Sequence, residues 1–208
     1  MKVIFADTLV SLPEGIRTVT VQTGPPDFRF TDEEFERYCA KHADLRIEMD
    51  KEGEMIIQLP VVTEGGGRNF HLTGRFYAWV ENDSTGIGFD SSTGFTLPNG
   101  AKRSPDVSWM RRERWDALPD RQKSKFARVC PDFVVELRSK WDRLKTLQNK
   151  MEEYLANGAQ LGWLIDPLEK KVHIYRPNFP VEILNNPTNI SGDPLLKGFV
   201  LKLEGILD

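Results

Sequence analysis

The sequence predicts an α/β fold in which helices flank a mixed central β-sheet. Apolar residues recur with helical periodicity over residues 69–82 and 144–156. Short runs rich in β-branched and aromatic residues lie between and after these segments, which is typical of strands in a sheet covered by helices. No Gly-x-Gly-x-x-Gly sequence is present, so a doubly wound dinucleotide-binding fold is not indicated.

The chain length favours one domain. At 208 residues the protein is long enough to bury one sizeable core and short for two. Residues 1–30 hold three prolines and few periodic apolar positions, so we interpret them as an extended N-terminal extension. Residues 31–208 are predicted to form a single domain.

The next segment predicts a helix and then a hairpin. Thr31 is followed by three acids, a helix N-cap signal that predicts a helix through Ala40. The runs Leu45–Met49 and Glu54–Leu59 are expected to pair as a β-hairpin. Gly65–Gly67 favours a flexible connection; no Lys-Ser/Thr follows it, so it is not a phosphate loop.

The centre and the C-terminal part predict strands around one further helix. Leu144–Ala156 is predicted to be helical and to end at Asn157-Gly158, whereas residues 111–128 are charged and helix-compatible, and we expect a surface excursion there. The tail after Phe179 predicts one short strand near Phe199–Leu203. The other expected strands are Gly88–Asp90, Gly94–Leu97, Asp106–Met110, Phe133–Leu137, Leu161–Ile165 and Val172–Tyr175.

Charge and cysteine content limit the class of protein. The net charge is −3, yet residues 101–150 hold fourteen of the 28 Lys and Arg against seven acids. This basic segment is either a solvated charged face or a surround that a phosphate-bearing substrate would favour. No apolar run is long enough to cross a bilayer, and Met1–Val10 has no signal-peptide pattern. Cys39 and Cys130 form no Cys-x-x-Cys pair. We therefore expect a cytoplasmic, reduced protein without a structural metal.

Two carboxylates are the strongest functional signal. Asp106 and Glu136 each sit in a β-like apolar stretch, where an unpaired charge is costly to bury. Asp132 cannot be the partner of Glu136, because four residues along one strand separate them by roughly 13 Å. Two acids brought together in a sheet suit a hard cation such as Mg²⁺, although they could equally point to the surface.

Several motifs occur in order and resemble a known family. They are Ser104-Pro-Asp-Val-Ser-Trp109, Pro131-Asp-Phe-Val-Val-Glu-Leu-Arg138 and Gly162-Trp-Leu-Ile-Asp-Pro167. The acid, the Glu-x-base strand and these flanking motifs resemble the PD-(D/E)xK nuclease superfamily and, more closely, the Uma family of restriction-endonuclease-like proteins. The resemblance spans roughly residues 30–177. It implies a restriction-endonuclease-like core.

The resemblance also implies a metal site and its ligands. Asp106, Glu136 and the backbone carbonyl of Leu137 would hold Mg²⁺ or Mn²⁺, and Glu48 is a possible third acid. For Glu48 the alternative is a solvent-facing position on the hairpin. The cation would activate water and neutralise phosphate charge.

The chain departs from the superfamily pattern at the base. Arg138 stands where the motif has Lys, and because Arg stays protonated it is expected to contact phosphate. A migrated lysine could replace the base. Lys150 lies about 40° outside the apolar stripe of the helix 144–156, so it is either a site lysine or a surface lysine whose stem follows the core. Lys140 is a weaker candidate, and Tyr154 is expected to pack in the core.

Two functions remain open. The first is a Mg²⁺-dependent endonuclease that hydrolyses phosphodiester bonds of nucleic acid, with DNA expected, through Asp106, Glu136, Arg138 and Lys150. The second is a catalytically inactive nuclease-fold protein that acts as a nucleic-acid-binding or oligomeric interaction module. The apolar strands also make a homodimer plausible.

Overall fold

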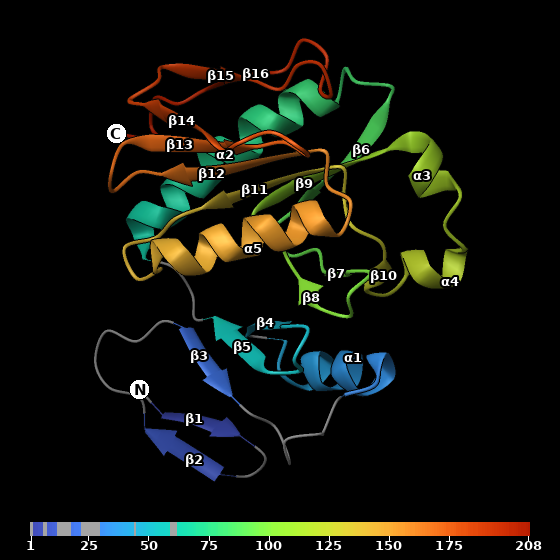
Figure 1. The fold of residues 1–208 in the computed structure, drawn as a ribbon. Coiled ribbons are helices and arrows are strands. Elements are labelled where there is room, and N and C mark those ends of the chain that lie inside the picture. Colours follow the sequence, from blue (N-terminus) through green and yellow to red (C-terminus); the bar gives the residue numbers. More distant parts are fainter. Residues whose placement is uncertain (1, 6–7, 12–17, 22–29, 44, 59–61) are drawn as a thin grey trace.

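A six-stranded mixed sheet forms the centre of the protein (Figure 1). The computed structural model describes residues 2–5, 8–11, 18–21, 30–43, 45–58 and 62–208. Strands β11 and β12 are parallel and their neighbours run antiparallel, so the predicted α/β class with a mixed sheet is confirmed. In spatial order the strands are β14 (Glu182–Asn185), β13 (Lys171–Tyr175), β12 (Leu161–Asp166), β11 (Phe133–Leu137), β9 (Val107–Arg111) and β6 (Gly86–Asp90).

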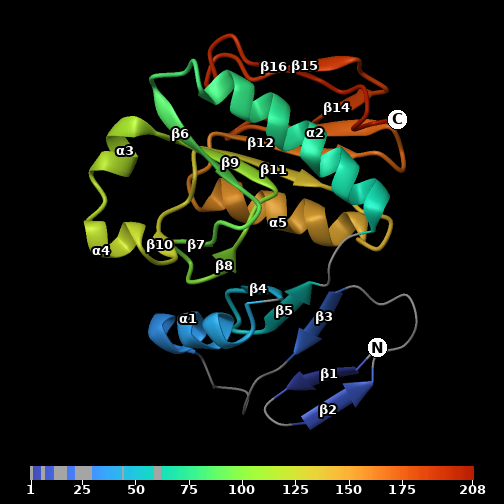
Figure 2. The ribbon, with the colours of Figure 1, turned by 180° about the vertical axis from the view of Figure 1, so that it is seen from behind.

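Two helices cover opposite faces of this sheet (Figures 1 and 2). Helix α2 (Thr63–Val80) packs on one face and α5 (Leu144–Ala156) on the other. Because side chains alternate along a strand, Phe133 and Val135 of β11 face α2, whereas Val134 packs in the cluster beneath α5. Glu136 shares the parity of Val134, so it lies on the α5 face.

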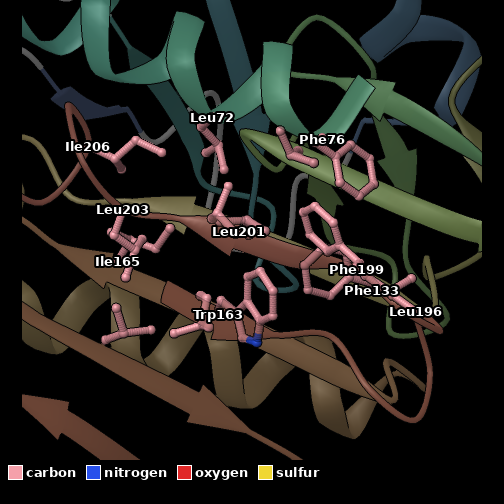
Figure 3. Packing of buried hydrophobic residues seen from close by; sticks show 14 of the residues in the cluster. Leu72, Phe76, Phe133, Trp163, Ile165, Leu196, Phe199, Leu201, Leu203 and Ile206 are labelled. Atoms are coloured by element: carbon pink, nitrogen blue, oxygen red, sulfur yellow. The ribbon is translucent and has the colours of Figure 1, made fainter. Parts of the chain in front are cut away.

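Figure 3 shows the core on the α2 side, where aromatic rings fill the space between helix and sheet. Phe133 and Trp163 meet edge to face at 4.9 Å between ring centroids, and Phe199 stacks on Trp163 at 5.7 Å. Leu72 and Phe76 of α2 close the cluster. These buried rings fix the position of β11, the strand that carries Glu136.

A second six-stranded sheet lies below the first in Figure 1 and carries α1 (Asp32–Lys41). The Thr31 hydroxyl and the Glu34 carboxylate form a reciprocal capping box, which confirms the predicted start of this helix. Phe35 of α1 is fully buried against the sheet. In spatial order the strands are β10 (Ala127–Arg128), β7 (Phe95–Thr96), β8 (Lys102–Arg103), β4 (Arg46–Met49), β5 (Met55–Gln58) and β3 (Thr18–Val21).

The ends of the chain differ from the sequence-based expectation. Where an extended lead-in was expected, β1 (Lys2–Phe5) pairs with β2 (Thr8–Ser11), and β3 pairs with β5. In the tail, β15 (Asn189–Ser191) and β16 (Val200–Lys202) form an antiparallel pair next to α2. The expected strand near Phe199–Leu203 is thus confirmed as β16, and β14 and β15 were not foreseen.

The expectation of a flexible connection at Gly65–Gly67 is wrong. These glycines belong to the first turns of α2, which begins at Thr63. Each glycine costs a helix about 1 kcal/mol relative to alanine. The burial of Leu72 and Phe76 further along the helix outweighs that cost.

Most of the remaining elements agree with expectation. Strands β8 and β10 were not predicted, and β10 lies inside the expected surface excursion with its Ala127 buried. Residues 111–128 contain α3 (Arg112–Asp116) and α4 (Asp120–Lys123) on the outside of the fold. Helix α5 has the predicted bounds, with Asn157 as its C-cap, and Gly158 after it has a φ of +113°. The predicted hairpin appears as β4 and β5, and its last expected residue, Leu59, lies outside the described residues.

Candidate active site

Three buried charged side chains from different elements meet between the two sheets. Glu48 comes from β4, Glu136 from β11 and Lys150 from α5. The Lys150 Nζ atom lies 2.8 Å from Glu48 Oε1 and 2.8 Å from Glu136 Oε1. Lys150 therefore bridges the two carboxylates. Lys150 is buried, which agrees with its predicted position next to the apolar stripe of the helix. Glu48 is buried as well and does not face the solvent.

Local packing explains why α5 delivers Lys150 to this point. Met151 and Tyr154 of the same helix are fully buried against the sheet. Opposite them, β12 presents Gly162, where an added Cβ atom would lie only 2.4 Å from Met151 Cε. The absence of a side chain at this position lets the helix approach the sheet closely.

Asp106 immediately precedes β9 and faces the end of β11. Its backbone N–H donates to the Val135 carbonyl at 3.0 Å. Its Oδ2 atom accepts a hydrogen bond from the Leu137 N–H at 2.8 Å. Asp106 is thus held beside the peptide unit that follows Glu136; it lies one residue before the neighbouring strand β9, where the predicted strand began at Asp106 itself.

Two arginines complete the charge balance of the site. Arg46 Nη1 lies 2.9 Å from Asp106 Oδ1, and Arg46 Nη2 donates to the Ser104 carbonyl. Arg103 Nη1 lies 3.4 Å from Glu48 Oε2, and Arg103 Nε donates to Glu153 Oε2 at 2.6 Å. Neither arginine was singled out from the sequence. For Arg46 the sequence contained one signal. It lies two residues before Glu48, and because side chains alternate along a strand, both lie on the same face of β4.

Burial and neighbouring charges shift the pKa values of the three central groups in different directions. Burial raises the pKa of Glu136 to about 7; Asp106 and Glu48 add to the rise, and Lys150 and Arg46 oppose it. Burial also acts on Glu48, but Lys150, Arg103 and Arg46 together outweigh it and lower its pKa to about 2. Burial disfavours the charged form of Lys150, yet Glu136 and Glu48 raise its pKa. The ammonium form of Lys150 is therefore the stable one.

The other predicted site residues lie elsewhere. Arg138 Nη1 contacts Asp166 Oδ2 at 2.7 Å and Glu169 Oε1 at 3.7 Å, so its guanidinium is engaged beyond the acid cluster. Its contact with phosphate stays a prediction. The Lys140 Nζ atom lies over the Trp141 ring, 5.0 Å from the centroid.

Asp132 also lies apart from the cluster. Its carboxylate pairs with Arg114 Nη1 at 2.8 Å and accepts a hydrogen bond from the Arg111 N–H at 3.0 Å. This agrees with the strand-geometry argument that separated it from Glu136.

The donor set has the chemistry of a divalent-cation site. Asp106 and Glu136 supply carboxylates and Leu137 supplies a carbonyl, the hard oxygen ligands that Mg²⁺ and Mn²⁺ prefer. Within the part of the chain that the structure describes, however, no three His, Cys, Asp or Glu side chains lie close enough together to hold a metal ion. Lys150 and Arg46 instead provide the positive charge between the acids.

Comparison with known families identifies the family of the chain. A family model, Uma2, described as "Putative restriction endonuclease", matches residues 32–204. The chain belongs to the Uma2 family. This confirms the resemblance inferred from the ordered motifs, and a nuclease-like function follows at the level of the family.

A solved structure shows the same fold. It is that of a "putative nuclease belonging to DUF820" from Anabaena variabilis ATCC 29413, with a TM-score of 0.63 and 22% identity. The match covers 77% of the Uma2 protein and 89% of the other chain. At this identity the likeness establishes the nuclease fold. No curated protein matches the sequence, and among the described residues of the Uma2 protein no helix is long and apolar enough to cross a membrane.

Proposed function

We propose that this Uma2 protein is a metal-dependent endonuclease that hydrolyses phosphodiester bonds of DNA. The observation that carries the proposal is the bridge from Lys150 to Glu48 and Glu136, with both contacts at 2.8 Å in a buried site. Burying three charges costs several kcal/mol per ion before their attraction is counted. Strongly shifted pKa values in such a cluster are typical of functional sites.

The ligands of Mg²⁺ or Mn²⁺ would be Asp106, Glu136 and the Leu137 carbonyl. Glu48 would support this site indirectly, because its carboxylate contacts Lys150. Such a cation supplies Lewis acidity: it lowers the pKa of a water molecule and neutralises charge on the phosphate. Glu136 has to be ionised to serve as a ligand, which its pKa of about 7 permits at neutral pH and above.

The chain's own residues would orient the water and hold the acids. Because its pKa is raised, Lys150 is suited to donate its third N–H to the attacking water, and not to remove a proton. The Tyr154 hydroxyl donates to Glu136 Oε1 at 3.1 Å and fixes that carboxylate. The basic charge of residues 101–150 would attract the DNA backbone.

Nicking of supercoiled plasmid tests the proposal. Cleavage should require Mg²⁺ or Mn²⁺, stop with EDTA, and be lost in Glu136→Gln, which keeps the volume of the side chain. Asp132→Asn is the matched control, because Asp132 is equally buried but pairs with Arg114 outside the cluster. Metal-dependent nicking that survives in Glu136→Gln at the wild-type rate would refute the assignment.

One observation favours the second function, a catalytically inactive nucleic-acid-binding or interaction module. The acids already have protein cations as partners, Arg46 for Asp106 and Lys150 for Glu136. Calorimetry with Mn²⁺ separates the two functions, because the endonuclease should bind the ion in wild type and not in Asp106→Asn. The homodimer and the cytoplasmic location stay predictions, which sedimentation and cell fractionation would test.

A further inference from the structure

Arg46 holds Asp106 with a contact that a divalent cation would have to replace. Its Nη1 atom lies 2.9 Å from Asp106 Oδ1, and its Nη2 atom reaches the Ser104 carbonyl two residues away. A Mg²⁺ ion bound to the same oxygen at about 2.1 Å would lie close to the guanidinium, and the two positive charges would repel each other. Arg46 therefore occupies the side of Asp106 that a divalent cation would need.

Arg46 is also the most accessible of the three cations around the acids. Its side chain is 28% exposed, against 8% for Lys150 and 9% for Arg103. Lys150 contacts two carboxylates and Arg103 contacts Glu48 and Glu153. Arg46 contacts one, so it loses the least ionic interaction when it moves.

The guanidinium of Arg46 has an unused donor. Its Nε atom is buried and has no hydrogen-bond partner among the described residues. An unpaired buried donor is unfavourable, and a shift of the side chain that pairs it would remove that cost. A planar guanidinium at the edge of an acid cluster is well suited to bind two oxygens of one phosphate.

We propose that Arg46 is a displaceable counter-ion of Asp106 and a phosphate-binding residue. Without metal it occupies Asp106; when a divalent cation takes that carboxylate, the guanidinium turns to a phosphate oxygen of the nucleic acid. The proposal rests on the proposed function, since it concerns the same acids. It assigns to Arg46 the phosphate contact that the sequence motif assigned to Arg138.

Metal binding without substrate tests the first half. Calorimetry with Mn²⁺ on the full chain should give affinity about tenfold higher in Arg46→Met than in wild type, the equivalent of one charged hydrogen bond no longer competing. Arg46→Lys, which keeps the charge, should stay near wild type. Arg176→Met is the matched control: Arg176 is 32% exposed and pairs with Glu182 at 2.8 Å, outside the site. Thermal unfolding in EDTA would verify that each variant is folded.

Binding of a labelled DNA duplex tests the second half. In EDTA, wild type and Arg46→Met should bind equally, because Arg46 is still held by Asp106. With Ca²⁺, another hard cation with oxygen ligands, wild type should gain affinity, and Arg46→Met should gain several-fold less.

The possible outcomes separate the two proposals. Wild-type Mn²⁺ binding that depends on Asp106, with equal or weaker binding in Arg46→Met, would overturn the counter-ion role and leave the proposed function intact. An equal Ca²⁺-dependent gain in DNA affinity in both proteins would overturn the phosphate role. Absence of Asp106-dependent Mn²⁺ binding in every variant would instead overturn the proposed function itself.

Discussion

The Tyr154 hydroxyl donates a hydrogen bond to Glu136 Oε1, the same oxygen that contacts Lys150 Nζ. One carboxylate oxygen thus has two donors from successive turns of α5. Tyr154 was expected to pack in the core, and it does so with its side chain fully buried. The ring packs in the core while the hydroxyl orients an acid.

Tyr154→Phe should therefore reduce activity more than it reduces stability. Removing the hydroxyl deletes one hydrogen bond, at about 1 kcal/mol of unfolding free energy. Loss of a group that orients a metal ligand typically lowers metal affinity or activity by about 10- to 100-fold. Urea unfolding and plasmid nicking on the same preparation compare the two effects. Unchanged Mn²⁺ affinity and nicking in a folded Tyr154→Phe protein would remove this role.

Lys150→Met should destabilise the fold strongly. It leaves Glu48 and Glu136 buried without the cation they share, and breaking a buried ion pair from one side costs about 3–5 kcal/mol. Urea denaturation measures the loss. The double variant Lys150→Met/Glu136→Gln should recover part of it, because one unpaired charge is removed. The control is Lys171→Met, because the Lys171 side chain is partly exposed and contacts Glu169 at 2.7 Å; this variant should change stability little.

Stability should fall as the pH is lowered below neutrality, with His173 as one cause. His173 is buried in β13, and neither ring nitrogen has a hydrogen-bond partner among the described residues. Burial lowers its pKa from the ordinary value of 6.5; Asp166 opposes the shift and Lys171 adds to it. The stabilising contribution is complete above pH 6.5 and is lost as the pH falls through the lowered pKa.

The variant His173→Leu isolates this contribution. Between pH 7.5 and pH 5, chemical denaturation should show a smaller loss of stability in His173→Leu than in wild type. Parallel pH profiles of the two proteins would show that another group governs the acid limit.

The buried cysteine should be unreactive in the native state. Burial raises the pKa of the Cys130 thiol to about 12, so the thiolate that reacts with disulfide reagents is scarce at pH 8. Labelling of Cys130, followed by mass spectrometry, should be slow in buffer and rapid in urea. Rapid native labelling at this position would indicate local opening around α5.

Much of the fold and part of the site followed from local pattern. Periodicity gave the bounds of α5, and strand geometry separated Asp132 from the pair Asp106 and Glu136. Lys150 was placed near the site by its angle on the helix, although a surface position was equally open. The apolar periodicity of α5 indicates on which side of the helix Lys150 lies, but it does not indicate which residues Lys150 contacts.

The remaining site residues depend on long-range contacts that local pattern does not contain. Glu48 is buried because Lys150, 102 residues later in the chain, reaches its carboxylate. Arg46 is a site residue because Asp106 lies across from it, 60 residues away. The start of α2 was missed for a related reason, since three glycines oppose helix formation locally and only packing of the helix on the sheet reverses that preference.

The spread of the charged cluster along the chain also bears on how the protein is made. A ribosome releases Glu48 early, but the ammonium group that neutralises it lies on α5, 102 residues further on. Contacts between such distant residues form late in folding. A nascent or truncated chain that ends before Lys150 has no ammonium group to bring Glu48 and Glu136 together, so we expect it to be unable to cut nucleic acid. The proposed activity would arise together with the completed fold.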